Sequence, residues 1–202
     1  FFEQPLGWTA ADSYAEIVLA YMDLYPEFTE EVTAWVSVWF SRNAMKNPYA
    51  QRHDPVTHQE VMNSRYVVYP FKLMDCCVYS EGAVSLIIAE EGKARALARN
   101  MGHPVVWITG VGAANEHSFV GKNAKILHRI ESDYIAARKA YAMAGIRDPL
   151  ADLQVAEIHD AFGPQALITG EELGFCPEGK AHTLVTEGII APDGKVPFNL
   201  SG

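Results

Sequence analysis

Two polar residues, His159 and Asp160, stand side by side after a short apolar run, 155–158, that is typical of a buried strand. A turn through Pro164 then leads into a predicted helix that Gly174 closes, the expected asymmetry of proline near a helix start and glycine past its end. Open α/β sheets place ligand chemistry where a strand gives way to a helix. A lone histidine there is more often a satisfied hydrogen-bonding residue than a catalyst, so spacing alone leaves both interpretations open.

Adjacent cysteines, Cys76 and Cys77, form the second candidate group. Their side chains diverge on an extended chain, and no Cys-x-x-Cys or histidine spacing completes a zinc site. The sequence therefore predicts no metal centre. The run Gly110–Asn115 comes close to a dinucleotide fingerprint, but it lacks the third glycine and a following strand that ends in an acid, so we set it aside.

Helices are predicted by apolar residues at helical spacing. The first extends from residue 10 to about 25, where Pro26 stops it. Thr29 is a plausible N-cap for the second helix. Its apolar stripe is expected to face the core. That stripe consists of Val32, Trp35, Val36, Trp39 and Phe40.

Strands are expected between further helices. Residues 84–89 are interpreted as a fully buried strand, and residues 105–109 and 155–158 as two more. This alternation indicates an α/β architecture. The further helices are predicted at 56–62, 90–100, 132–144 and 165–173.

Composition limits the class of protein. The chain has 202 residues, of which 49% are hydrophobic and 20% charged, as in a soluble globular protein with an ample core. The formal net charge of −9 and the lack of a basic run argue against nucleic acid or an anionic membrane surface as a partner. No stretch approaches a transmembrane span. Three cysteines make no disulfide framework, which favours a reducing, cytoplasmic setting.

Three motifs, in the right order, carry a family resemblance. HDAF at 159–162 resembles the HDAF/HDCF signature of thiolases related to the sterol-carrier-protein type, where it replaces the Asn-Glu-Ala-Phe of ordinary thiolases. EELGFCPEG at 171–179 resembles that branch's YEDLGLCPKGE run, and PFNLSG at 197–202 resembles its PVNPSGG. Residues 41–65 also resemble the thiolase segment that covers coenzyme A.

The resemblance implies a five-layered αβαβα thiolase fold. Residues 1–70 would be part of the loop domain over coenzyme A, and residues 71–202 the C-terminal βαβαβ half, cut before the family's Gly-His-Pro and Cys-x-Gly motifs. The tripeptide at 102–104 is also Gly-His-Pro, but it lies upstream of His159, whereas the family's loop lies downstream, so we expect a turn. Because the chain starts without Met and stops inside a motif, we expect part of a longer subunit.

The implied function is that of a thiolase-like acyl-CoA C-acyltransferase of lipid metabolism, for example β-oxidation. It would cleave or form a 3-ketoacyl-CoA through a Cys acyl-enzyme whose nucleophile lies outside this chain. Coenzyme A thioester is the substrate, and no cofactor or metal is expected. His159 is the predicted catalytic residue, because the matching Asn of ordinary thiolases fixes a water on the thioester oxygen. The resemblance suggests that Cys77 and Phe162 line the pantetheine site and that Arg52 binds the phosphates, while Asp160 is taken as structural.

Alternatives remain open at this point. Some members of the branch are retro-aldolases on steroid-type side-chain acyl-CoAs and use Tyr in place of Cys. A non-catalytic thiolase-like partner subunit is the second alternative. The expected partners, also implied by the resemblance, are a second thiolase-like subunit in a homodimer or heteromer and a small OB-fold and zinc-ribbon protein.

Overall fold

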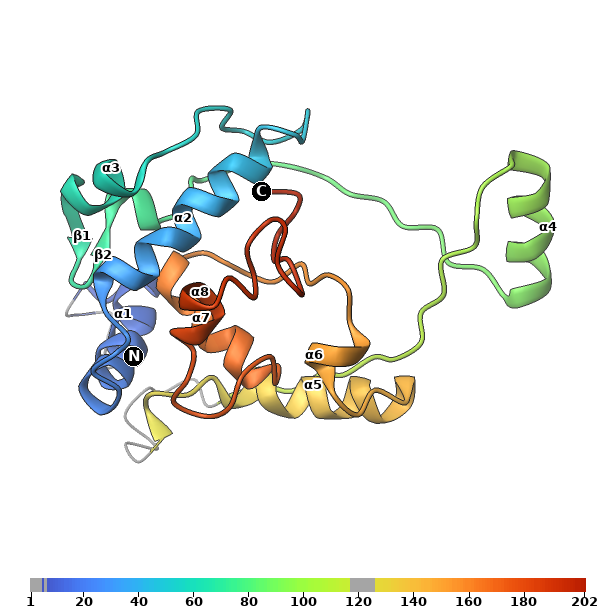
Figure 1. Ribbon diagram of the computed structural model, residues 1–202. Helices are drawn as coiled ribbons and strands as arrows, with labels where there is room; N and C mark the ends of the chain where they lie inside the picture. Colours follow the sequence, from blue (N-terminus) through green and yellow to red (C-terminus); the bar gives the residue numbers. More distant parts are fainter. Residues whose placement is uncertain (1–4, 6, 117–125) are drawn as a thin grey trace.

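The computed structural model describes residue 5 and residues 7–116 and 126–202. Within these ranges it is mostly helical, with one two-stranded sheet (Figure 1). Residues 117–125, which separate the rejected dinucleotide-like run from the predicted helix at 132–144, lie outside the described part. The elements are α1 (Ala10–Leu24), α2 (Glu30–Ala44), α3 (His58–Asn63), β1 (Tyr66–Val68), β2 (Phe71–Lys72), the 3-10 turn η2 (Leu73–Asp75), α4 (Glu91–Met101), α5 (Glu131–Ala144), α6 (Pro149–Asp152), α7 (Gly163–Glu172) and α8 (Thr183–Thr186).

The helix predictions are confirmed, because local signals fix their ends. Thr29 caps α2, and its side-chain oxygen accepts a hydrogen bond from the backbone N–H of Val32 at 3.3 Å. Pro26 follows the end of α1 as expected. Gly145 ends α5 in the left-handed region at φ 74°, which glycine adopts without steric cost.

Helix α7 forms the centre of the main core, with α1, α2 and α5 packed around it. Its first eight residues are all buried. Phe162, just before α7, stacks on Phe71 with ring centroids 4.5 Å apart and an interplanar angle of 2°. A Cβ on Gly170 would lie 2.7 Å from the Cδ1 atom of Leu184, so a larger residue here would force the Leu184 side chain on α8 to shift.

The prediction that the whole apolar stripe of α2 faces the core is only partly right. Val36 and Phe40 are buried as expected, but Trp35 is 38% exposed and Trp39 is only partly buried. The helix buries a different face, because it packs against both α7 and α3. Trp35 is thereby left at the outer edge, where its ring centroid lies 5.0 Å from that of His58.

The strand predictions for residues 84–89 and 105–109 are wrong in this structure. Both segments are extended but unpaired, and they form two arms that carry α4 away from the rest of the chain (Figure 1, green). Val84 is 90% exposed and Ile87 is 95% exposed. A strand needs partners for its backbone N–H and C=O groups, and the described residues supply none to these arms.

The predicted strand at 155–158 is reduced to a single parallel bridge between Ala156 and Phe198. The expected α/β sheet is therefore replaced by a helical assembly with very little sheet. None of the helices in the described ranges has the length and hydropathy that a membrane span requires.

Candidate functional site

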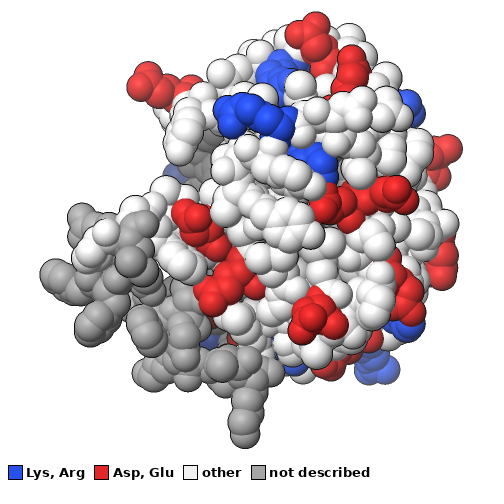
Figure 2. Space-filling model, turned by 90° about the vertical axis from the view of Figure 1, so that its left-hand side faces the viewer, with Lys and Arg blue, Asp and Glu red and all other residues white. Residues whose placement is uncertain are grey.

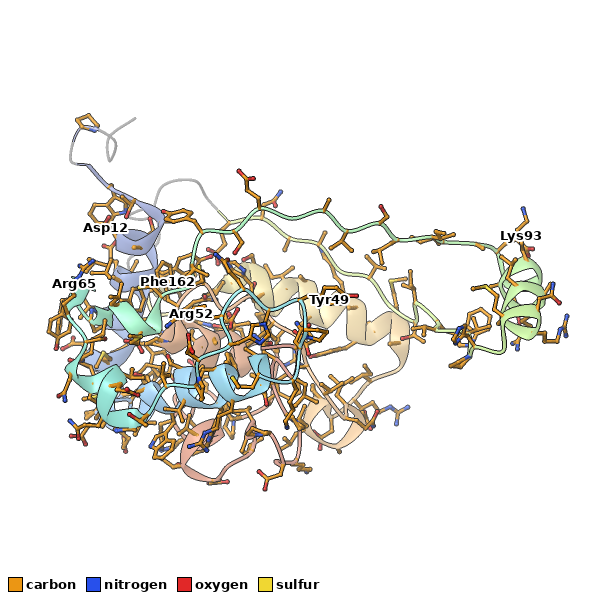
Figure 3. All side chains as sticks on the ribbon, turned by 90° about the horizontal axis from the view of Figure 1, so that it is seen from above. Asp12, Tyr49, Arg52, Arg65, Lys93 and Phe162 are labelled. Carbon is orange, nitrogen blue, oxygen red and sulfur yellow. The ribbon has the colours of Figure 1, made fainter. Side chains whose placement is uncertain are left out.

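A cavity of about 320 Å³ opens where four separate parts of the chain meet. The four parts are the second half of α2 with the loop after it, the end of η2 with the residues that follow, the turn into α7 at Asp160 and Gly163, and the last two residues, Ser201 and Gly202. In Figure 3, Arg52 and Tyr49 lie on the loop after α2, while Lys93 marks α4 far away at the end of the arms. The cavity thus belongs to the packed part of the molecule.

Three aspartates line this cavity, Asp54, Asp75 and Asp160, and the last two have perturbed carboxyl groups. Asp75 is only 8% exposed, and its carboxylate accepts hydrogen bonds from the hydroxyl of Ser37 at 3.3 Å and from the backbone N–H of Lys72 at 3.0 Å. Burial is the main cause that raises the pKa of Asp75. Burial likewise raises the pKa of Asp160, against an opposing hydrogen bond from the side chain of Asn199. Both groups therefore bind a proton more readily than in water.

The cysteine pair also lines the cavity, but the two thiols differ. The backbone N–H of Cys77 donates to the carbonyl of Ala161 at 2.9 Å, and Cys76 forms an antiparallel bridge with Phe162. These bonds fix Cys77, whose side chain is exposed, beside the HDAF turn. Burial raises the pKa of Cys76 to about 11, which keeps this thiol protonated and a poor nucleophile at neutral pH.

Arg52 lies on the cavity wall as an exposed cation. One guanidinium N–H donates to the sulfur of Met74 at 3.6 Å. The neighbouring Gln51 accepts a hydrogen bond from the hydroxyl of Ser80 at 2.6 Å, which joins the two walls. A cation at the edge of a hydrogen-bonded cavity suits a ligand with a negatively charged end.

His159 does not line the cavity, although its neighbour Asp160 does. Its side chain is exposed, and its carbonyl accepts a hydrogen bond from the buried side chain of Gln165 at 3.4 Å. The charge of its imidazole lowers the pKa of two carboxyls, Asp160 and Asp133, against the larger effect of burial. The carboxyl of Asp133 also accepts a hydrogen bond from the hydroxyl of Thr169 at 2.9 Å.

Phe162 lies in the core and is 8% exposed. It is not among the residues that line the cavity. The structure thus brings Arg52 and Cys77 together and leaves His159 and Phe162 just beyond them. Their proposed roles stay predictions.

Sequence reasoning missed Asp75 and took Asp160 as purely structural. Asp75 offers no sequence signal beyond its place before the two cysteines, because its burial depends on α2 packing over η2. The direction of the Asp160 side chain likewise cannot be inferred from its position next to His159. Within the described ranges, no group of three His, Cys, Asp or Glu side chains could hold a metal ion.

The face of the molecule drawn in Figure 2 carries more acidic than basic side chains. Figure 2 shows Asp and Glu side chains spread over one face, with Lys and Arg in small groups between them. No continuous basic strip crosses that face. This distribution agrees with the net charge of −9 and does not favour a polyanion as a partner on that face.

Comparisons with known proteins agree on the family but divide between two kinds of enzyme. Residues 112–202 match a family model described as "Thiolase C-terminal domain-like". An acetyl-CoA acetyltransferase of Methanocaldococcus jannaschii is 35% identical over 192 residues, which cover 95% of this chain and 47% of that protein. The 17-hydroxy-3-oxo-4-pregnene-20-carboxyl-CoA lyase of Mycobacterium tuberculosis is 32% identical over 205 residues, covering 100% of this chain and 52% of that protein.

A solved structure, titled "Ltp2-ChsH2(DUF35) aldolase", superposes with a TM-score of 0.80 and 30% sequence identity. The match covers 96% of this chain and 50% of that chain. This chain therefore spans about half the length of the relatives it matches.

Proposed function

Because this chain belongs to the thiolase superfamily, we propose that it forms part of an enzyme that makes or breaks a carbon–carbon bond beside an acyl-CoA thioester. The observation that supports this most is the cavity beside the HDAF turn, with Arg52 and Cys77 on its walls. The five-layered αβαβα fold, divided at residue 70 into loop domain and C-terminal half, belongs to the same proposal.

The first candidate reaction is that of a 3-ketoacyl-CoA acyltransferase. A Cys thiolate supplied from outside this chain attacks the 3-keto carbon, and the bond between C2 and C3 breaks. The electron pair moves onto C2 and the thioester oxygen as an enolate, which takes up a proton to give acetyl-CoA, while the shortened acyl group stays on the Cys. The acyl group then passes from Cys to the thiol of free coenzyme A. An acetyl-CoA acetyltransferase among the relatives favours this reaction.

The second candidate reaction is a retro-aldol cleavage. A base removes the proton of a 3-hydroxyl group, and the same C2–C3 bond breaks to leave a ketone and the same thioester enolate. A side-chain lyase and an aldolase among the similar proteins favour this reaction. In both reactions the imidazole N–H of His159, directly or through water, would stabilise the enolate oxygen.

Substrate and partners follow from the same proposal. Arg52 would bind the coenzyme A phosphates, and Cys77 and Phe162 would line the route of the pantetheine arm. The solved aldolase carries a DUF35 component in its title, so a small partner of this kind, beside a second thiolase-like subunit, is proposed here too. The reaction would take place in the reducing cytoplasm.

The test is the intact mass of the native protein before and after incubation with a 3-ketoacyl-CoA, combined with analysis of the products. A gain of one acyl group, with free coenzyme A consumed, supports the acyltransferase. Release of a ketone from a 3-hydroxyacyl-CoA, without an adduct and without consumption of coenzyme A, supports the aldolase. No adduct and no cleavage would contradict both reactions and leave a non-catalytic partner subunit.

A further inference from the structure

Asn199 has a backbone conformation that few side chains tolerate. Its φ is 45°, and it is the one non-glycine residue at positive φ within the described ranges. Asparagine adopts this left-handed region more readily than most residues, because its short amide can hydrogen-bond locally. The residue is also buried, with 3% of its surface exposed. Its conformation is therefore held by the contacts around it.

The amide of Asn199 bonds both backbone groups of a single residue, Ile158. Its Oδ1 atom accepts from the Ile158 N–H at 2.7 Å, and its Nδ2 group donates to the Ile158 carbonyl at 3.1 Å. The backbone N–H of Asn199 also donates to the carbonyl of Ala156 at 2.9 Å. Ile158 immediately precedes His159, so one side chain replaces the missing strand partner at this point.

The other contacts of Asn199 lead to α2 and to the cavity. Its carbonyl accepts from the side-chain amide of Asn43 on α2 at 3.0 Å. Its side chain also lowers the pKa of the Asp160 carboxyl, which lines the cavity, against the larger effect of burial. Two residues further on, the hydroxyl of Ser201 donates to Glu157 at 2.5 Å. The segment after Phe198 thus ties the backbone on both sides of Ile158 to the second helix.

We propose that Asn199 is a positioning residue, which holds the backbone that carries His159 and Asp160 in a fixed place relative to α2 and the cavity. This inference rests on the proposed acyl-CoA reaction. Asparagine is the residue type that meets all the requirements together. Asp offers no donor for the Ile158 carbonyl, glycine fits the φ but makes neither side-chain bond, and Gln places its amide one methylene further out.

The experiment measures carbon–carbon cleavage by the native protein as a function of pH, with Asn199→Asp and Asn199→Gly beside the wild type. Displacing a reacting group by about 1 Å can cost about a hundredfold in rate. We therefore expect kcat to fall between about thirtyfold and a hundredfold in both variants, with KM changed less than about twofold. In Asn199→Asp the donor to the Ile158 carbonyl is lost and a negative charge is added close to His159 and Asp160, so the acid limb of the kcat profile should shift to higher pH.

A double substitution shows whether Asn199 acts through His159. In a His159→Ala background, the Asn199→Asp change should lower kcat by less than about threefold, because residues that act as a unit are not additive. Phe175→Leu serves as the control for lost packing. It weakens the core, where Phe175 meets Phe198 edge to face at 5.1 Å, and it should lower the melting temperature but leave kcat per folded molecule unchanged.

The outcomes are distinguishable. A wild-type protein without any acyl-CoA activity contradicts the proposed function itself. If the wild type is active, either of two results for the variants would overturn the positioning role. The first is that both Asn199 variants keep full kcat per folded molecule, as judged by circular dichroism. The second is that their losses simply add to that of His159→Ala. Asn199→Gly keeps the test open if Asn199→Asp fails to fold, since glycine accommodates a positive φ.

Discussion

At the scale of single residues, His159 is the side chain on which the proposed chemistry depends. It is exposed, and it is electrostatically coupled to two partly buried carboxyls, those of Asp160 and Asp133. An imidazole that keeps an N–H for an oxyanion is what an enolate intermediate requires.

Replacing His159 by alanine should lower kcat of the native protein by about 10²–10³-fold, the usual cost of one oxyanion donor. His159→Asn should recover part of the loss, because asparagine stands at this place in ordinary thiolases. His103→Ala is the matched control, since His103 is also exposed but lies in the turn after α4. Steady-state measurement of kcat for the three variants tests this role of His159. An equal loss of kcat in His103→Ala would contradict it.

The two neighbouring cysteines allow a test of the cavity. Alkylation by iodoacetamide near pH 8 should modify the exposed Cys77 much faster than Cys76, whose thiol has a pKa of about 11. Because deprotonation makes the nucleophile, labelling of Cys76 should rise only as the pH approaches that value. Bound coenzyme A should slow the labelling of Cys77, as followed by peptide mass mapping. Unchanged labelling at saturating coenzyme A would show that the cavity is not its site.

At the scale of elements, Gly110 and Gly112 allow the residues after the second arm to lie directly on α5. A Cβ on Gly112 would stand 1.8 Å from the carbonyl oxygen of Ala136, and one on Gly110 would stand 2.2 Å from that of Ala140. Neither backbone carbonyl can move away without breaking the helix. These two glycines are therefore required by packing, although both have ordinary φ angles.

Gly112→Ala should destabilise the native protein by about 1–3 kcal/mol, the usual cost of overpacking. Gly82→Ala is the control, because a Cβ there meets nothing within 4 Å, and its effect should stay within about 0.5 kcal/mol. Chemical denaturation followed by circular dichroism measures both. Equal stability of the two variants would mean that the segment at 110–113 does not lie on α5.

The elements also show how far the sequence alone could lead. The ends of the long helices were predicted nearly to the residue, because Thr29, Pro26 and Gly145 start or stop a helix through contacts with their sequence neighbours alone. Strands depend on partners elsewhere in the chain, so the apolar run at 84–89 was predicted correctly as extended and wrongly as buried. The cavity was out of reach for the same reason, since the burial of Asp75 depends on α2.

At the scale of the whole molecule, the two arms are the feature that the packed core does not explain. They expose large apolar side chains in sequence, among them Leu86, Ile87 and Val106, which are 84%, 95% and 89% exposed. Contiguous apolar surface of this kind mostly marks an interaction site in a folded protein. Among the described residues, the backbone of the arms also has no sheet partner, and unpaired N–H and C=O groups are the usual template for strand addition.

We therefore expect these arms to be paired and covered in the native protein. Hydrogen–deuterium exchange measures this directly. The amides of residues 84–88 and 105–109 should exchange at unprotected rates in the isolated 202-residue chain and at least about a hundredfold more slowly in the native protein. The amides of the buried helix α7 are the internal control and should be protected in both. Fast exchange of the arms in the native protein as well would contradict the expectation, because backbone groups in a sheet are hydrogen-bonded and closed to solvent.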